Sequence, residues 1–351
     1  MNFNNEIFNN LEEAHRRRVE FFTQHHDEDD ENLNVNEKID LFNSLIEKKG
    51  EQGLVVLTRF KITEFKHIVE ICKESLNCCS KKGRTCKLNI TDKMLVTLTY
   101  LATGMKYEHM GTLFNIRLPL LQRAIDMTLK SISSALVNEF FKLKVPLNNE
   151  KKFKYHPQAC GAIDTTLIPI SKPHNFEEQK KHYSMKHGQC GIKIQALVRP
   201  NGICTTFAFG FPGSVHDMKV LELTNWVNSY LSYNVTLANN ANAIHHYPCL
   251  FDKGYTGLHN TCHEAIITIR KPKFHDLSQD ENDLNNRIES DRIIVENFFG
   301  RLKSIFGILA TRFRGDKKNH LKYIIPICMS LTNYHISLHP LRVEDDEETE
   351  N

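Results

Sequence analysis

Apolar residues recur every three or four positions through the first half of the chain, a spacing that predicts helices. Further helices are expected after a cap at Thr91, over residues 107–114, and from the first turn marked by Pro119. Residues 39–150 are therefore expected to be helical. Before Thr91, one set of apolar side chains shares a helical face: Ile62, Phe65, Ile68, Val69, Cys72 and Leu76.

Three of these expected helices, over about residues 91–137, follow the order of a helix-turn-helix motif. In such a motif the last helix enters the major groove of DNA and its first turns contact base edges. Gln122 and Arg123 are then candidates for contact with bases, and Lys130 for contact nearer the backbone. A small helical bundle with no DNA contact shows the same spacing and is the alternative.

Beyond a break at residues 146–154, the hydrophobic pattern changes to that of strands. Residues 161–170 are an apolar run that predicts a strand. Residues 192–198 and 203–209 flank a Pro-Asn-Gly turn and predict a β-hairpin. A further strand is expected to end at Asp252.

The second half is also expected to contain helices between its strands. Ser214, with Asp217 three residues later, has the spacing of a capping box at the start of a helix. A strand at 265–269 and a long helix after Ser278 complete the pattern. Strands interleaved with helices after a helical region indicate an α/β fold.

The charge is distributed unevenly along the chain, which has 351 residues and a net charge of +3. Residues 1–31 carry −6 and residues 344–351 carry −6, which leaves +15 for residues 32–343. We therefore expect a disordered acidic arm over residues 1–38 and an acidic tail over residues 341–351. A basic body favours a polyanionic partner such as DNA, with ordinary surface charge as the alternative.

Composition narrows the class of protein further. At 40% hydrophobic residues the chain can bury a sizeable core, and it contains no apolar run of eighteen residues, so no membrane association is expected. The polar start at Met1 does not resemble a signal peptide. The ten cysteines lack repeated paired spacing and are expected to be buried thiols rather than disulfides.

Three acidic residues lie in strongly apolar surroundings: Asp164, Asp252 and Glu296. A carboxylate desolvated in this way costs several kcal/mol unless it is paired or binds a cation. Carboxylates from two strands and one helix suit two Mg²⁺ ions, which together promote displacement at a phosphodiester. The alternative is that each acid is a helix cap or an ion-pair partner.

Four short motifs in order resemble those of PIF/Harbinger transposases, a DDE group that includes a domesticated Harbinger-derived nuclease. The resemblance covers about residues 60–335. The motifs are Gly161-x-x-Asp164-x-Thr166-x-Ile168, Pro212-Gly213-Ser214-x-His216-Asp217, Asp252-x-Gly254-Tyr255 and Glu296-x-x-Phe299-Gly300-x-Leu302-Lys303.

The resemblance implies an RNase H-like mixed sheet flanked by helices over residues 151–340. Asp164 is then expected on the first strand, Asp252 after the fourth, and Glu296 on a following helix, with spacings of 88 and 44 residues. These three residues would bind Mg²⁺ or Mn²⁺, two ions per site. His216 and Asp217 are possible auxiliary residues, with a helix cap as the alternative for Asp217.

The activity implied by the resemblance is cleavage at transposon ends and joining of the freed 3′-OH to target DNA. It also implies a nuclear location, a separate Myb-like DNA-binding partner and a homo-oligomer that holds two DNA ends. Residues 81–84 are a weak nuclear-localisation candidate. A second basic segment, residues 299–322, has a net charge of +6 and is expected to contact DNA through Arg301, Lys303, Arg312 and Arg314.

The chain departs from the family pattern without losing an expected metal ligand: Thr165 replaces Gly, Met218 replaces Ser, and Asn297 and Ile305 each replace Arg. Loss of the Arg beside Glu296 keeps a second hypothesis open, a domesticated DNA-binding adaptor that is catalytically weak or inactive. A metal-dependent phosphatase would also account for the acids. It would not account for the helix-turn-helix or the basic body.

Overall fold

The computed structural model describes residues 40–78, 88–141, 151–224, 248–258, 265–313 and 320–341. These residues belong to one compact unit, Asp40–Asn351. The predicted acidic arm, nearly all of the predicted acidic tail and the basic stretch 81–84 lie outside the described residues. No helix within them is both long enough and apolar enough to cross a membrane.

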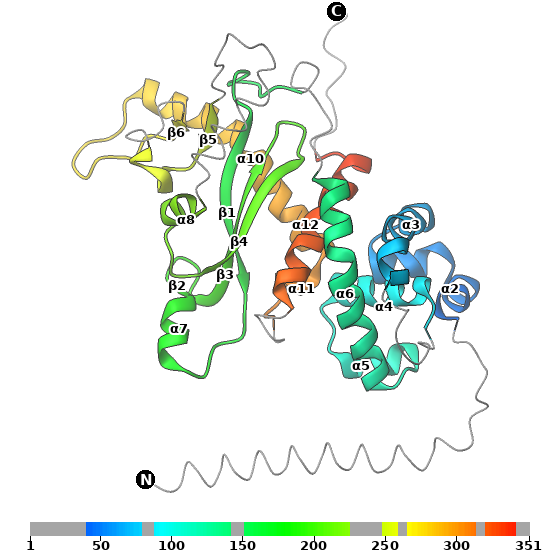
Figure 1. Ribbon diagram of the computed structural model, residues 1–351. Helices are drawn as coiled ribbons and strands as arrows, with labels where there is room; N and C mark the ends of the chain where they lie inside the picture. Colours follow the sequence, from blue (N-terminus) through cyan, green and yellow to red (C-terminus); the bar gives the residue numbers. More distant parts are fainter. Residues whose placement is uncertain are drawn as a thin grey trace, which may run out of the picture. The chain divides into compact units, whose positions relative to one another are not determined.

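The N-terminal part is helical, as predicted (Figure 1). The cap before the third helix is Asn89 rather than Thr91, because the Asn89 side chain accepts a hydrogen bond from the Asp92 amide. The helices described in this part are α2 (Leu41–Thr58), α3 (Ile62–Cys78), α4 (Ile90–Thr103), α5 (Tyr107–Phe114) and α6 (Leu118–Phe140).

Helices α4, α5 and α6 follow one another in the order of the predicted helix-turn-helix. Asn115 ends α5 in the left-handed conformation, and Pro119 lies in the first turn of α6, as expected. One face of α6 is buried against α3, α4 and the last helix of the chain. Its other face is exposed and carries the residues predicted to contact DNA.

The second part is a mixed sheet with helices on both sides. The sheet order is β2-β3-β1-β5-β6, and β4 pairs with β3. Strands β1, β3 and β4 pair antiparallel, whereas β5 is parallel to both β1 and β6. The strands are β1 (Gly161–Pro169), β2 (Tyr183–Ser184), β3 (Gln189–Val198), β4 (Cys204–Pro212), β5 (Cys249–Phe251) and β6 (Ala265–Ile267).

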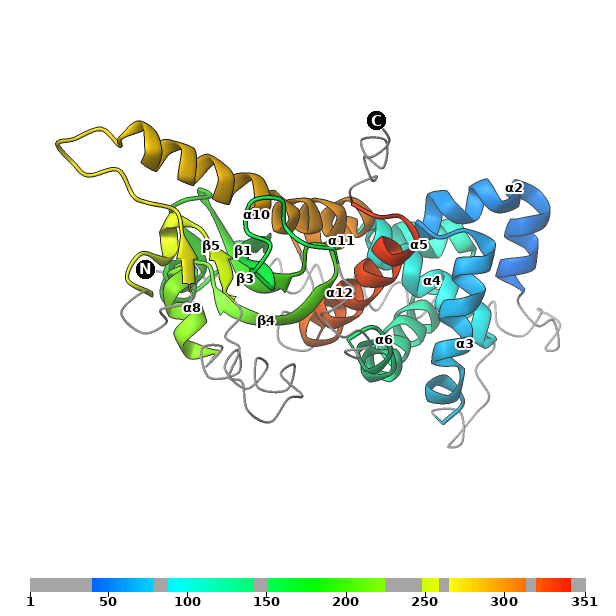
Figure 2. The ribbon, with the colours of Figure 1, turned by 90° about the horizontal axis from the view of Figure 1, so that it is seen from above.

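Helices α10 and α8 lie on opposite sides of the strands (Figure 2). Alternation along β1 produces this arrangement, because Ile163 packs with Leu221 of α8 whereas Asp164 is bonded to Arg292 of α10. The arrangement is that of an RNase H-like fold, as predicted. The remaining elements are α7 (Phe176–His182), α8 (Asp217–Leu223), η3 (Lys253–Tyr255), α10 (Gln279–Ile305), α11 (Gly307–Ala310) and α12 (Leu321–Leu338).

Three local features differ from the sequence prediction. The unit of α7 and β2 was not expected, because its polar, charged sequence shows neither the apolar spacing of a helix nor the alternation of a strand. Helix α8 has its N-cap at His216 instead of Ser214. The predicted long helix begins after Ser278 with a complete capping box, but its apolar stripe, expected to continue through Phe306 and Leu309, is interrupted. Helix α10 ends at Ile305, and the buried Phe306 has a non-helical conformation.

Helix α12 connects the helical part to the sheet through Asn333. The Asn333 side chain accepts a hydrogen bond from Cys204 N at 2.9 Å and donates to Cys204 O at 2.7 Å. The same amide also donates to Phe140 O, at the end of α6, at 3.3 Å. One buried side chain therefore holds α12, α6 and β4 together.

Candidate active site

The strand register places Asp164 and Asp252 at the same level of the sheet. Ala162 on β1 is opposite Leu250 on the parallel strand β5. Each aspartate follows its paired residue by two positions, and residues two apart on a strand lie on one face. Asp252 comes directly after β5, so two acids that are 88 residues apart in sequence become neighbours.

Asp164 is held by one cation and one backbone amide. Its Oδ2 is 3.2 Å from Arg292 Nη2, and its Oδ1 accepts a hydrogen bond from Thr165 N at 2.7 Å. Burial raises the pKa of Asp164 to about 6 even though Arg292 lowers it, and the charges of Asp252 and Asp217 add to the increase. A third acid therefore lies near the pair.

Asp252 is the N-cap of η3, and its Oδ1 accepts a hydrogen bond from Lys253 N at 2.7 Å. Its other oxygen lies beside Gly254. A Cβ atom at Gly254 would be 3.6 Å from Asp252 Oδ2 and 4.0 Å from Asp217 Oδ2. One oxygen of each of these two aspartates therefore borders the same space, which the glycine leaves open.

Asp217 lies in the first turn of α8, and its carboxylate is bonded to the sheet. Lys193 Nζ donates to Asp217 Oδ1 at 2.7 Å and to Val215 O at 2.6 Å. The capping interpretation required Asp217 to bond first-turn amides, and the N-cap His216 makes no capping hydrogen bond with its side chain. The Asp217 carboxylate is thus oriented by Lys193, with its second oxygen near Gly254.

Glu296 lies on α10, on the side of the helix that follows β1. Arg292, one turn earlier, reaches Asp164, and Lys303, two turns later, donates to Thr166 Oγ1 at 2.7 Å. Glu296 itself is exposed. The charges of Asp252 and Asp217 act on Asp164, and Glu296 lies on the helix that carries Arg292 to the same strand. The role of Glu296 as a third metal ligand stays a prediction.

The donors at this site fit a hard divalent cation. Mg²⁺ takes one or two carboxylates and completes its coordination with water and phosphate oxygens. No group of three His, Cys, Asp or Glu side chains able to enclose a metal ion occurs in the part of the chain that is described. The charges of Asp252 and Asp217 nevertheless raise the pKa of Asp164, a repulsion between like charges that a bound cation would relieve.

The residues predicted to contact DNA fall into two groups. Gln122, Arg123 and Lys130 are all exposed on α6, where the helix-turn-helix prediction requires them to be. In the second basic segment, Arg312 is exposed and Arg314 lies outside the described residues.

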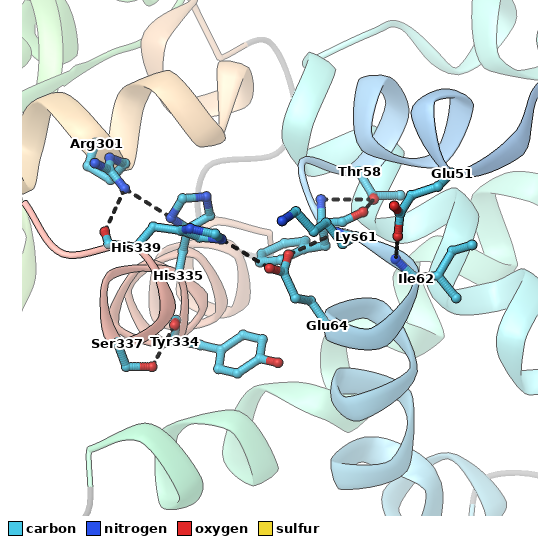
Figure 3. Close-up of polar contacts among 11 residues, drawn as sticks. Glu51, Thr58, Lys61, Ile62, Glu64, Arg301, Tyr334, His335, Ser337 and His339 are labelled. Carbon is cyan, nitrogen blue, oxygen red and sulfur yellow. Dashed lines mark hydrogen bonds and ion pairs between the residues drawn. The ribbon is translucent and has the colours of Figure 1, made fainter.

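Arg301 and Lys303 are both half-buried and make different contacts. Arg301 Nη1 donates to His335 Nδ1 and to His339 O, each at 3.1 Å, at the C-terminal end of α12 (Figure 3). His339 in turn bonds Glu64 of α3 at 3.0 Å. Arg301 is therefore occupied within the protein, whereas Lys303 lies along the strand that carries Asp164.

Three residues at the site were missed by the sequence analysis: Arg292, Lys193 and Tyr255. Arg292 is 4% exposed in the structure. In the sequence it is one of many charged residues of a polar helix, and nothing local indicates its partner Asp164 on β1. Lys193 interrupts an apolar strand, as Asp164 does, and that interruption was the available signal. Tyr255 belongs to a quoted motif, yet nothing in the sequence shows what its hydroxyl contacts.

Two comparisons with known proteins found similar sequences. Residues 163–333 match the family described as DDE superfamily endonuclease. The chain is 26% identical over 274 residues to the probable transposase for insertion sequence element IS702 of Microchaete diplosiphon, covering 78% of this chain and 91% of that protein. No solved structure matches. The matched segment includes Asp164, Asp252 and Glu296.

Proposed function

We propose that this chain is a metal-dependent DNA endonuclease of the DDE type that acts as a transposase. The observation that carries the proposal is the parallel register of β1 and β5, which brings Asp164 and Asp252 to one level of the sheet. The match to DDE superfamily endonucleases over residues 163–333 supports it.

In this proposal Asp164 and Asp252 bind the divalent cations and Glu296 completes the ligand set from α10. The chemistry supplied by two bound Mg²⁺ or Mn²⁺ ions is activation of the attacking oxygen and stabilisation of the leaving oxygen of a phosphodiester. Arg292 holds the buried Asp164 in place through its ion pair. Lys303 places a positive charge beside β1, where a DNA phosphate would approach.

The proposed reaction has two steps that share one site. Water attacks a phosphodiester at a transposon end and releases a 3′-OH, and that 3′-OH then attacks a phosphodiester of target DNA. The same in-line displacement serves both steps, so no second catalytic site is needed. Asp217, oriented by Lys193 towards the space beside Asp252, is an auxiliary acid of the same site.

The experiment is a cleavage assay on supercoiled plasmid and on end-labelled DNA with Mg²⁺ or Mn²⁺. The variants Asp164→Asn, Asp252→Asn and Glu296→Gln are expected to be folded by circular dichroism and to lose cleavage. Glu222→Gln is the matched control, because Glu222 is an exposed acid of α8 whose partner is the exposed Lys219. Normal cutting by either aspartate variant would remove the proposal.

A second candidate function is a DNA-binding adaptor that does not cut. The observation in its favour is that Asn297 and Ile305 each stand where the PIF/Harbinger pattern has Arg. Filter binding with and without Mg²⁺, run beside the nicking assay, separates the two functions. Salt-sensitive binding with no cleavage under any divalent ion would favour the adaptor.

The resemblance to PIF/Harbinger transposases supports a finer proposal. Under it the protein acts in the nucleus as a homo-oligomer and uses a separate Myb-like DNA-binding partner. Light scattering of the protein with and without transposon-end DNA tests the oligomer. Microscopy of a tagged chain, expressed with and without the Myb-like protein, tests the location and the partner.

A further inference from the structure

A buried tyrosine hydroxyl connects the segments that carry the two aspartates. Tyr255 lies three residues after Asp252, and 1% of its surface is exposed. Its hydroxyl oxygen is 3.1 Å from Thr165 Oγ1, and Thr165 follows Asp164 on β1. The contact joins η3 to the first strand directly beside both carboxylates.

Gln195 extends the same contact to the third acid. Its Nε2 donates to the Tyr255 hydroxyl at 2.8 Å, to Thr165 Oγ1 at 3.3 Å and to the backbone carbonyl of Asp217 at 3.4 Å. Because a carbonyl oxygen only accepts, the Asp217 contact favours the orientation in which the Gln195 amide nitrogen faces the cluster. In that orientation Gln195 Oε1 is buried and has no hydrogen-bond partner among the described residues. The segments of Asp164, Asp252 and Asp217 therefore meet at one set of polar atoms.

The cluster is buried, and the Tyr255 hydroxyl stays protonated. Gln195 is fully buried, and burial raises the pKa of Tyr255 far above its usual value. The Tyr255 hydroxyl thus accepts from Gln195 while its own proton is available to Thr165. The tyrosine ring packs on Phe251 at a centroid distance of 5.2 Å, so removal of the hydroxyl leaves the ring's packing in place.

We propose that Thr165, Gln195 and Tyr255 form a positioning cluster that sets the spacing of Asp164, Asp252 and Asp217, and so the affinity of the site for divalent cations. The inference rests on the proposed function. In this proposal none of the three would contact the cation or the DNA, and each would act through the aspartates.

The test measures Mn²⁺ affinity by isothermal titration calorimetry on the full chain without DNA. Loss of one buried hydrogen bond corresponds to roughly a three- to tenfold change in an equilibrium constant. Tyr255→Phe and Thr165→Val are each expected to raise the Mn²⁺ dissociation constant by about that factor. The double variant is expected to cost more than either single variant and less than their sum, because the two hydroxyls share one contact and each also accepts from Gln195.

The control is Tyr334→Phe, because the Tyr334 ring is also buried and its hydroxyl makes no hydrogen bond in the described residues. It should leave Mn²⁺ affinity unchanged. Hydrogen exchange of metal-free protein gives a second readout, in which Tyr255→Phe is expected to speed exchange of amides at residues 252–258.

The outcomes are distinct. If the folded Tyr255→Phe variant binds Mn²⁺ as tightly as the parent, the cluster is only structural and the inference is overturned, whatever the exchange data show. If the parent itself binds no Mn²⁺, the proposed function fails, and unchanged exchange at residues 252–258 would then overturn the positioning role as well. Weaker Mn²⁺ binding with faster local exchange supports the proposal.

Discussion

Arg292 and Asp164 form a buried ion pair across the interface between α10 and β1. Their side chains are 5% and 23% exposed, and Arg292 Nη2 lies 3.2 Å from Asp164 Oδ2. The pair anchors the long helix α10 to the first strand. In addition, the charge of Arg292 lowers the pKa of Asp164. Removal of either side chain leaves a buried charge unmatched.

Replacement of Arg292 is therefore expected to destabilise the fold. Arg292→Met should lower the free energy of unfolding by about 2–4 kcal/mol at pH 7, because Asp164 stays buried without its cation. Urea denaturation followed by circular dichroism measures this. Lys219→Met, which removes an exposed pair with Glu222, should change stability by less than about 1 kcal/mol. Equal effects of the two substitutions would contradict the prediction.

The raised pKa of Asp92, on α4, is expected to make the stability of the protein depend on pH. Burial raises its pKa to about 6, although its carboxylate accepts a hydrogen bond from Phe42 N. The folded state therefore binds a proton that the unfolded state has released, so Asp92's contribution to stability is largest below about pH 4 and is lost as the pH rises through 6.

Asp92→Asn, which keeps an acceptor for Phe42, should accordingly stabilise the protein at pH 8 by about 1–3 kcal/mol. The gain should disappear near pH 4. Thermal unfolding of both proteins between pH 4 and 8 tests the pattern. A gain that does not vary with pH would assign the effect to packing instead of charge.

Arg301 and Lys303 should separate stability from DNA binding. Arg301→Gln is expected to destabilise the protein, because Arg301 binds His335 and the end of α12. Burial lowers the pKa of His335 to about 4, so the ring is neutral at pH 7 and accepts the bond. Lys303→Gln should instead reduce DNA affinity and lower the salt slope by about one. Chemical denaturation measures the stability effect, and fluorescence anisotropy at several salt concentrations measures DNA affinity. Loss of DNA affinity in Arg301→Gln together with loss of stability in Lys303→Gln would contradict the prediction.

The exposed start of α6 should decide which DNA is bound. Arg123→Ala and Gln122→Ala are expected to weaken binding to the preferred sequence by roughly ten- to a hundredfold for a base contact, with little change for unrelated DNA. Lys130→Ala should weaken binding to all sequences equally. Anisotropy with transposon-end and scrambled duplexes measures both effects. Uniform loss for all three variants would assign α6 to backbone contact only.

The secondary structure was largely predictable because its signals are local. The period of apolar residues predicted α5 and, to within a residue or two, β1, and Ser278 and Glu281 form the capping box that begins α10. The unit of α7 and β2 was missed, since its stability comes from contacts that are distant in sequence. Ser214 from the sheet loop approaches it through a bond to Lys181 O.

At the candidate site the individual acids were predictable and their partners were not. An acid in an apolar strand is a visible anomaly, so Asp164 and Asp252 stand out in the sequence. Arg292 is 128 residues from Asp164 and lies on a helix rich in charge, so no local pattern selects it. The exposed position of Glu296 depends on how α10 lies along β1, which only the folded chain determines.

The two bonds between Asn333 and Cys204 occupy the backbone donor and acceptor that a further strand would use at this end of β4. The same amide also binds the end of α6, so one side chain joins the helical part to the sheet. Under the proposed function, it would connect the helix proposed to contact DNA bases to the sheet that carries the proposed cleavage site. The fold would then set the number of base pairs between the recognised sequence and the scissile bond.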